Sequence, residues 1–126
     1  MRRLLIGLCL IFIFASCEKT NSLVGKTFAA FGYHVDEMNA GIIHIDGYDA
    51  YYVYRFVDEA RAERTTRKYS AKGEVIGEIE SCTYTYEYPI IEITYIPSYS
   101  DKEITVQGEF LDKNTFRINK SDYYLQ

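Results

Sequence analysis

Large apolar and polar residues alternate along most of the chain after residue 22, and this alternation predicts β-strands. The clearest case is the segment 82–88, in which Cys and Tyr alternate strictly with Thr and Glu. Successive strand residues point to opposite faces, whereas a helix repeats about every 3.6 residues. Tyr and Phe, which favour strands, are abundant, and Pro is scarce. We therefore expect an all-β domain.

The first strand is expected at roughly residues 24–34, with Phe31 and Tyr33 on one face. The opposite face carries Phe28, Ala30 and Gly32. A connection with a short apolar piece at residues 42–45 follows, and a second strand is expected over residues 50–57. This second strand is apolar on both faces, as expected for a strand covered on two sides. One of its faces carries Tyr52, Tyr54 and Phe56.

Residues 58–69 allow two interpretations. Acidic residues at the start of this segment and basic residues at its end would suit a helix dipole. A helix here would have little besides Ala60, Ala62 and Tyr69 to bury, so its packing would contribute little stability. We therefore favour a strand over residues 60–69.

The rest of the chain predicts further antiparallel strands joined mostly by short turns. They are expected at residues 74–88, with a bend at Gly77, and at residues 90–96, 103–111, 115–119 and 122–125. Seven or eight such strands predict a meander that closes into an up-and-down β-barrel, with a small β-sandwich as the alternative. Closure would also remove the exposed edges of a chain rich in strand-forming residues.

The first seventeen residues have the build of a secreted lipoprotein leader. Two arginines precede the apolar run Leu4–Phe14, and two small residues then lead to Cys17. The run is shorter than the about 20 residues that a spanning helix needs, and a conventionally cleaved leader would not require the cysteine. We expect residues 1–16 to be a signal peptide and Cys17 to carry a lipid. Residues 17–22 would then be a polar tether, and residues 23–126 a single β domain.

The net charge and the number of cysteines limit which partners and which disulfides the mature chain can have. Loss of two arginines from 14 basic residues leaves 12 against 18 acidic residues, a formal charge of −6. This balance argues against nucleic acids and anionic membranes, which favour clusters of Lys and Arg. With Cys9 removed and Cys17 lipidated, Cys82 is left without an internal disulfide partner. We expect it to be buried and inert rather than paired with another chain.

Two motifs resemble the small lipocalin-like lipoproteins of gram-negative bacteria. They are the opening Leu-Val-Gly-Lys-Thr-Phe at residues 23–28 and the tyrosine-rich hairpin at residues 84–95, downstream of the lipobox-like leader. In that family the opening usually ends in Trp, whereas this chain has Phe28. The resemblance implies an up-and-down barrel and binding of an apolar ligand, and it transfers no catalytic residue.

Candidate chemistry in the sequence is sparse. His34 and His44 lie near Asp36, Glu37 and Asp46, but a zinc or copper site needs three or four converging ligands, which this spacing does not guarantee. We expect no metal site and no cofactor.

Catalytic patterns are equally weak. Ser98 and Ser100 lie in no nucleophile-elbow motif, and Glu78 with Glu80 would sit on one strand face, where a solvated role is the simpler interpretation. We therefore expect a protein that is not an enzyme.

Two functions remain for such a chain. The first is a lipid-anchored binding protein whose barrel holds a small apolar molecule. The second is a protein-interaction module, such as an envelope-complex subunit or an inhibitor of a basic lysozyme-like enzyme, since an acidic surface suits a basic partner. We expect the anchor in the outer membrane with the domain facing the periplasm, and surface display as the alternative. Whether the tyrosines point into or out of the barrel should decide between the two functions.

Overall fold

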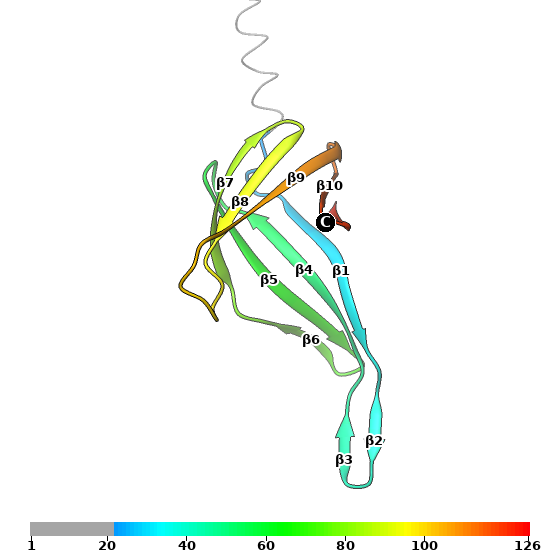
Figure 1. Ribbon diagram of the computed structural model, residues 1–126. Helices are drawn as coiled ribbons and strands as arrows, with labels where there is room; N and C mark the ends of the chain where they lie inside the picture. Colours follow the sequence, from blue (N-terminus) through cyan, green and yellow to red (C-terminus); the bar gives the residue numbers. More distant parts are fainter. Residues whose placement is uncertain (1–21) are drawn as a thin grey trace, which may run out of the picture.

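The computed structural model describes residues 22–126, which form eleven β-strands and no helix. The first strand, β1 (Thr27–Val35), pairs on one side with β4 (Tyr48–Phe56) and on the other with β11 (Ser121–Leu125). A further pairing of β4 with β5 (Arg61–Ser70) closes the sheet into a ring of eight antiparallel strands (Figure 1). The remaining strands of the ring are β7 (Glu80–Glu87), β8 (Ile90–Tyr95), β9 (Ile104–Asp112) and β10 (Thr115–Ile118).

Neighbours around the ring follow the order of the sequence, apart from the two short additions described next. This is the order of a meander, and its closure by the β1–β11 and β4–β5 pairs leaves no open sheet within the ring. The predicted all-β, up-and-down barrel is therefore confirmed, and the sandwich alternative is not.

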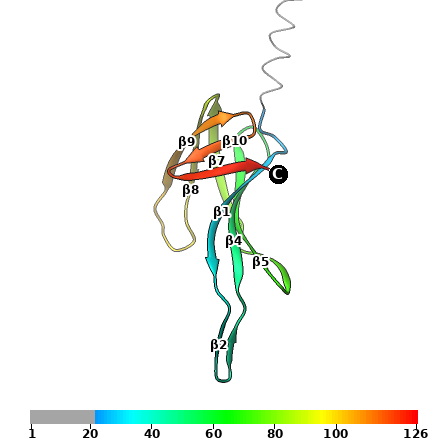
Figure 2. The same cartoon turned by 90° about the vertical axis from the view of Figure 1, so that its right-hand side faces the viewer.

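Two additions extend beyond the ring. Strands β2 (Met38–Ala40) and β3 (Ile43–Ile45) pair with each other and form a hairpin that projects from the far end of β1 and β4 (Figures 1 and 2). We call residues 36–47 the finger. Strand β6 (Gly73–Ile76) pairs with the last residues of β5. The described chain begins at the opposite end of the barrel from the finger (Figure 1).

Aromatic rings fill the interior of the barrel. Phe28, Phe56 and Phe116 are each 0% exposed, and the ring centroid of Phe28 lies 5.9 Å from that of Phe56 and 5.0 Å from that of Phe116. An eight-stranded barrel is just wide enough for side chains to fill it. Tyr52, Tyr54 and Phe56 share a face of β4, as predicted, and this face points inward, because Tyr54 and Phe56 belong to the core and Tyr52 packs against it.

The predicted faces of β1 are wrong after residue 31. Phe31 lies outside the barrel, whereas Tyr33 pairs with Ala50, whose side chain is fully buried. The register shifts between Phe31 and Tyr33, so the two side chains do not share a face. Gly32 occupies this bulge, where an added Cβ would lie 2.9 Å from the ring of Tyr52.

Most of the segment 58–69 lies in strand β5, which begins at Arg61, so the strand interpretation is confirmed over the helix. The single strand predicted over residues 74–88 is wrong, because the chain forms β6 and then β7 instead. Both pair with β5: β6 with Arg67–Ser70 and β7 with Arg61–Arg64. The break occurs at Gly77, whose N–H donates a 2.8 Å hydrogen bond to the carbonyl of Thr66.

No helix in residues 22–126 is long and apolar enough to cross a membrane.

The adjacent tyrosine pairs divide between the two sides of the wall, as expected from strand alternation. Tyr123 is 7% exposed and its neighbour Tyr124 is 55% exposed.

Candidate functional site

The finger carries an apolar face that the barrel does not cover. The register pairs Met38 with Ile45 and Ala40 with Ile43, and these four side chains share one face because strand faces alternate. Met38 is 52% exposed, Ile43 58% and Ile45 40%. Ile42 follows Gly41 at the tip and is 103% exposed. A small hairpin with one wholly apolar, solvent-facing side is the result.

The other face of the finger is polar. His44 pairs across the hairpin with Asn39, and its Nδ1 shares a hydrogen bond with the Asn39 side-chain oxygen. The His44 Nε2 lies 2.6 Å from Asp46 Oδ1 and 3.6 Å from Glu37 Oε1. Residues 34–49 contain four carboxylates and no Lys or Arg. The finger is therefore amphipathic, with acidic groups behind its apolar face.

Hydrogen bonds tie the base of the finger to the barrel. The His34 ring lies between two carboxylates, with Nδ1 2.6 Å from Asp49 Oδ1 and Nε2 2.8 Å from Asp36 Oδ1. The hydrogen bond with Asp49, followed by that with Asp36, raises the pKa of His34 above its ordinary value. From the turn between β5 and β6, the Lys72 ammonium reaches to 2.9 Å from Asp46 Oδ2. These contacts link the base of the hairpin to β4 and to the turn between β5 and β6.

A close backbone approach also shapes this base. Gly47 lies where the chain leaves the finger to enter β4. A Cβ at this position would lie 2.8 Å from the backbone nitrogen of Glu37 and 2.9 Å from the carbonyl oxygen of Val35. A side chain would push the two chains of the hairpin apart here.

The structure brings together some of the side chains considered as metal ligands. Glu37, His44 and Asp46 each offer a ligand atom, and these atoms lie within 4.8 Å of one another. His44 Nε2 and Asp46 Oδ1 already share a hydrogen bond at 2.6 Å, and the Lys72 ammonium, followed by His44, lowers the pKa of Asp46. A lysine ammonium this close would oppose a bound cation. The cluster is explained as a hydrogen-bonded network, and the absence of a metal site stays a prediction.

Four other candidate residues from the sequence are Cys17, Cys82, Glu78 and Glu80. Cys17 lies outside the described residues, so its lipidation stays a prediction. Cys82 is buried as expected, and burial raises the pKa of its thiol to about 11. Glu80 forms an ion pair with Arg64 at 3.2 Å, whereas Glu78 precedes β7 and lies in no strand. The structure therefore does not place these two carboxylates on a common strand.

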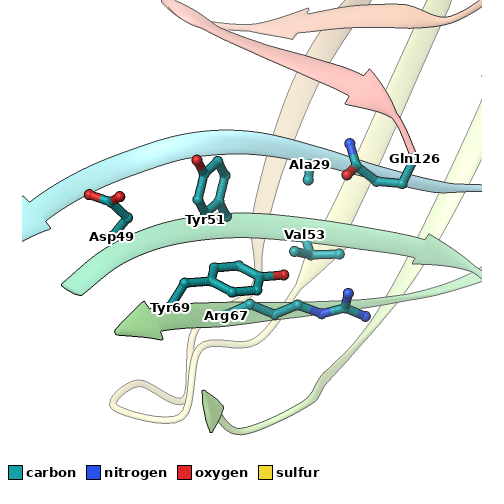
Figure 3. A pocket seen from close by; sticks show the side chains of 7 residues that line it. All are labelled: Ala29, Asp49, Tyr51, Val53, Arg67, Tyr69 and Gln126. Carbon is teal, nitrogen blue, oxygen red and sulfur yellow. The ribbon is translucent and has the colours of Figure 1, made fainter. Parts of the chain in front are cut away.

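A second feature lies on the outer wall over β1, β4 and β5 (Figure 3). It is a hollow of about 360 Å³, which we call the trough. Its lining residues are Ala29, Asp49, Tyr51, Val53, Arg67, Tyr69 and Gln126. Two further hollows, of about 510 and 210 Å³, lie over β7 and β8 and share Arg61, Thr83 and Thr94.

Sequence reasoning missed both features. The apolar alternation of Met38, Ala40, Ile43 and Ile45 was a signal for the finger, but only the register of the hairpin shows that these side chains share a face. The trough had no local signal, because its lining combines residues from β1, β4 and β5 with the C-terminal Gln126.

Comparison with known proteins finds no family model, no curated protein and no solved structure that matches this chain.

Proposed function

We propose that this protein is a lipid-anchored, non-enzymatic protein of the cell envelope that binds a protein partner through the apolar face of its finger. The observation that carries the proposal is the set of exposed apolar side chains on one side of a projecting hairpin. Monomeric proteins rarely expose contiguous apolar patches beyond a few hundred Å², and larger ones mark interaction sites. A projecting hairpin of two strands also leaves unpaired backbone N–H and C=O groups along its edges, and such edges promote aggregation unless they are covered.

The charge of the finger indicates the chemistry of the partner. Three carboxylates and no Lys or Arg accompany the apolar face in residues 36–47. A complementary partner has an apolar groove with a basic rim, because complementary charge speeds association and excludes wrong partners. An inhibitor of a basic lysozyme-like enzyme is one form of this function, and a subunit of an envelope complex is another.

A membrane surface suits the finger less well. Helices and loops that bind anionic lipid carry Lys and Arg, with aromatic residues at the level of the headgroups. Residues 36–47 contain no Lys, Arg, Trp, Tyr or Phe, and their carboxylates would be repelled by anionic lipid. A protein groove therefore fits this face better than a bilayer.

The start of the described chain and the finger lie at opposite ends of the barrel (Figure 1). The described chain begins at Ser22 at one end of the barrel, and the finger projects from the other (Figure 1). With a lipid on Cys17, the finger would point away from the membrane that holds the protein. In the outer membrane, with the domain in the periplasm, it would be free to meet a partner there.

Binding of a small apolar molecule inside the barrel has less support. The rings of Phe28, Phe110 and Phe116 are in mutual contact along the axis, with centroid distances of 5.0 to 5.9 Å. Side chains therefore already occupy the space that such a ligand would need over this part of the barrel. This alternative rests on the fold alone.

A matched pair of isoleucines tests the proposal. Ile43 on the finger is 58% exposed, and Ile79, between β6 and β7, is 60% exposed. Ile43→Ser should reduce recovery of the partner from solubilised envelopes about tenfold, whereas Ile79→Ser should leave it unchanged, since loss of a buried apolar contact weakens binding. Equal recovery with both variants, at equal amounts of folded protein, would rule out the finger as the binding surface.

A further inference from the structure

Arg67 differs from the other arginines of the described chain. Each of the others has a carboxylate oxygen within 3.2 Å of its guanidinium: Arg55 with Glu63, Arg61 with Asp58, Arg64 with Glu80 and Arg117 with Asp122. For Arg67 the corresponding contact, from its Nε to Glu74 Oε1, is 3.8 Å. Its Nε is shielded from water and has no hydrogen-bond partner among residues 22–126.

Such a donor calls for an explanation, because buried polar groups in folded proteins almost always have partners. The guanidinium of Arg67 lies in the trough, beside the side chains of Val53 and Tyr69 (Figure 3). At the other end of the trough, Asp49 is already engaged by His34 at 2.6 Å. One end of the trough therefore holds the Arg67 guanidinium, whose Nε is 3.8 Å from Glu74 Oε1 and has no hydrogen bond. The other end holds the Asp49 carboxylate, which already has a hydrogen bond with His34.

Apolar surface accompanies this cation. Ala29 and Val53 form the floor of the trough, and the rings of Tyr51 and Tyr69 stand beside it (Figure 3). These two rings are T-shaped to each other, with centroids 5.6 Å apart. A flat apolar group could pack on the floor against a ring edge.

We propose that the trough binds a small organic molecule that carries a carboxylate on an apolar body, with Arg67 as the anion-binding residue. The Arg67 side chain is 34% exposed, and the two terminal nitrogens of its planar guanidinium can donate to both oxygens of a carboxylate. The volume of about 360 Å³ is near the lower end of the roughly 300–1,000 Å³ typical of ligand pockets, so the ligand is small. The site is separate from the apolar face of the finger and does not depend on the proposed partner.

Benzoate and benzamide test this site directly, because the two have the same shape and differ in charge. The protein is labelled on its tyrosine rings and titrated by NMR. Benzoate should shift the signals of Tyr51 and Tyr69 saturably, and benzamide should bind at least about tenfold more weakly. Equal affinity for the two compounds, or the absence of a saturable shift with benzoate, would overturn the proposal.

Three variants locate the binding. Arg67→Gln should raise the Kd for benzoate about tenfold, because it removes the cation and keeps a polar side chain. Ala29→Leu should do the same by filling the floor from outside the core, so it serves as the second variant if Arg67→Gln fails to fold. Arg117→Gln, which removes an arginine already paired with Asp122, should leave the Kd within about twofold. An unchanged Kd in folded Arg67→Gln or Ala29→Leu would overturn the assignment.

A last experiment distinguishes two kinds of molecule that could supply the carboxylate, a free small acid and the C-terminus of a peptide. N-acetylphenylalanine presents its carboxylate as a peptide C-terminus does. Weaker binding than benzoate supports a free small acid as the ligand, and tighter binding overturns that assignment in favour of a peptide terminus. Finger variants such as Ile43→Ser should leave all these affinities unchanged, so the failure of this site and the failure of the proposed function are distinguishable.

Discussion

Replacing Phe116 by Ala should nearly unfold the barrel. Phe116 is 0% exposed and lies on β10 at the centre of the interior. Its ring contacts those of Phe28, Tyr54, Phe56, Phe110 and Tyr123. The ring of Tyr123 is stacked on it with a centroid distance of 4.9 Å. Few substitutions elsewhere in the domain would remove as many packed neighbours.

The size of the effect follows from this packing. Truncation of a buried Phe to Ala costs about 3–5 kcal/mol through lost transfer energy and the cavity that remains. Aromatic pairs add about 0.5–1.5 kcal/mol each beyond burial, so the five ring contacts of Phe116 place it at the upper end, about 4–5 kcal/mol. Small domains are stable by about 5–15 kcal/mol, so much of the total would be lost. At about 4 °C or more per kcal/mol, Tm should fall by roughly 15 °C or more.

Phe31 is the control, since it is also a Phe on a strand but lies on the outer face and is 55% exposed. Phe31→Ala should cost less than about 1 kcal/mol, as expected for a half-exposed side chain. Urea unfolding of the chain from Ser22 onward, followed by circular dichroism, gives both free energies. Similar losses for the two variants would refute the filled interior, because Phe116 would then have space around it.

Three further predictions concern titrating and reactive groups. His34 should titrate above the ordinary pKa of about 6.5 in an NMR pH series, and Asp49→Asn should lower its pKa, because the hydrogen bond with Asp49 is the largest cause of the rise. Because folding raises the pKa of His34, the stabilisation from His34 is complete below about pH 6.5 and is lost as the pH rises through the folded-state pKa. A loss of stability from this group on acidification would contradict this. Cys82 should react with a thiol reagent at pH 8 far more slowly in the folded than in the unfolded protein, because burial raises its pKa to about 11, and mass spectrometry of the peptide with Cys82 measures both rates. Cys17→Ala should leave the precursor uncleaved and abolish labelling by an alkyne fatty acid, whereas absence of label on the wild type would exclude the lipoprotein assignment.

Much of the fold could be predicted from alternation and turn chemistry. The segment after Asp58 was correctly assigned as a strand, because its few apolar residues could not make a stable helix, and β5 then contributes Ala62 to the core. The turn after β9 is one of the short turns that were expected between strands, and there the Asn114 N–H donates a 2.8 Å hydrogen bond to Asp112 Oδ1. Both features depend on neighbours in the sequence.

The errors occurred where distant strands decide the local structure. The bulge at Gly32 depends on the fit against Tyr52 of β4, so alternation through β1 assigned Tyr33 to the wrong face. The break at Gly77 arises because β5 is long enough to pair with two successive strands. Neither partner could be identified from the segment that contains the glycine.

The finger and the trough also combine features that could be read from the sequence with features that depend on the fold. Carboxylates around His44 were visible in the sequence, but the hairpin register was needed to separate them from the apolar face. The isolation of Arg67 could not be read from the sequence, because it depends on how closely Glu74 of the neighbouring β6 approaches. Charge patterns indicate which groups are present, and only the fold shows which are paired.

The central claim is that the finger contacts a protein partner, and site-specific photo-crosslinking in the intact cell tests it most directly. A photoreactive residue is placed at Ile42, the fully exposed tip, and in a separate strain at Ile79, which is exposed on the barrel. We expect a discrete adduct with one protein from Ile42, its loss when Ile43→Ser is added, and no such adduct from Ile79. The same adduct from both positions, or adducts with lipid alone from Ile42, would contradict it.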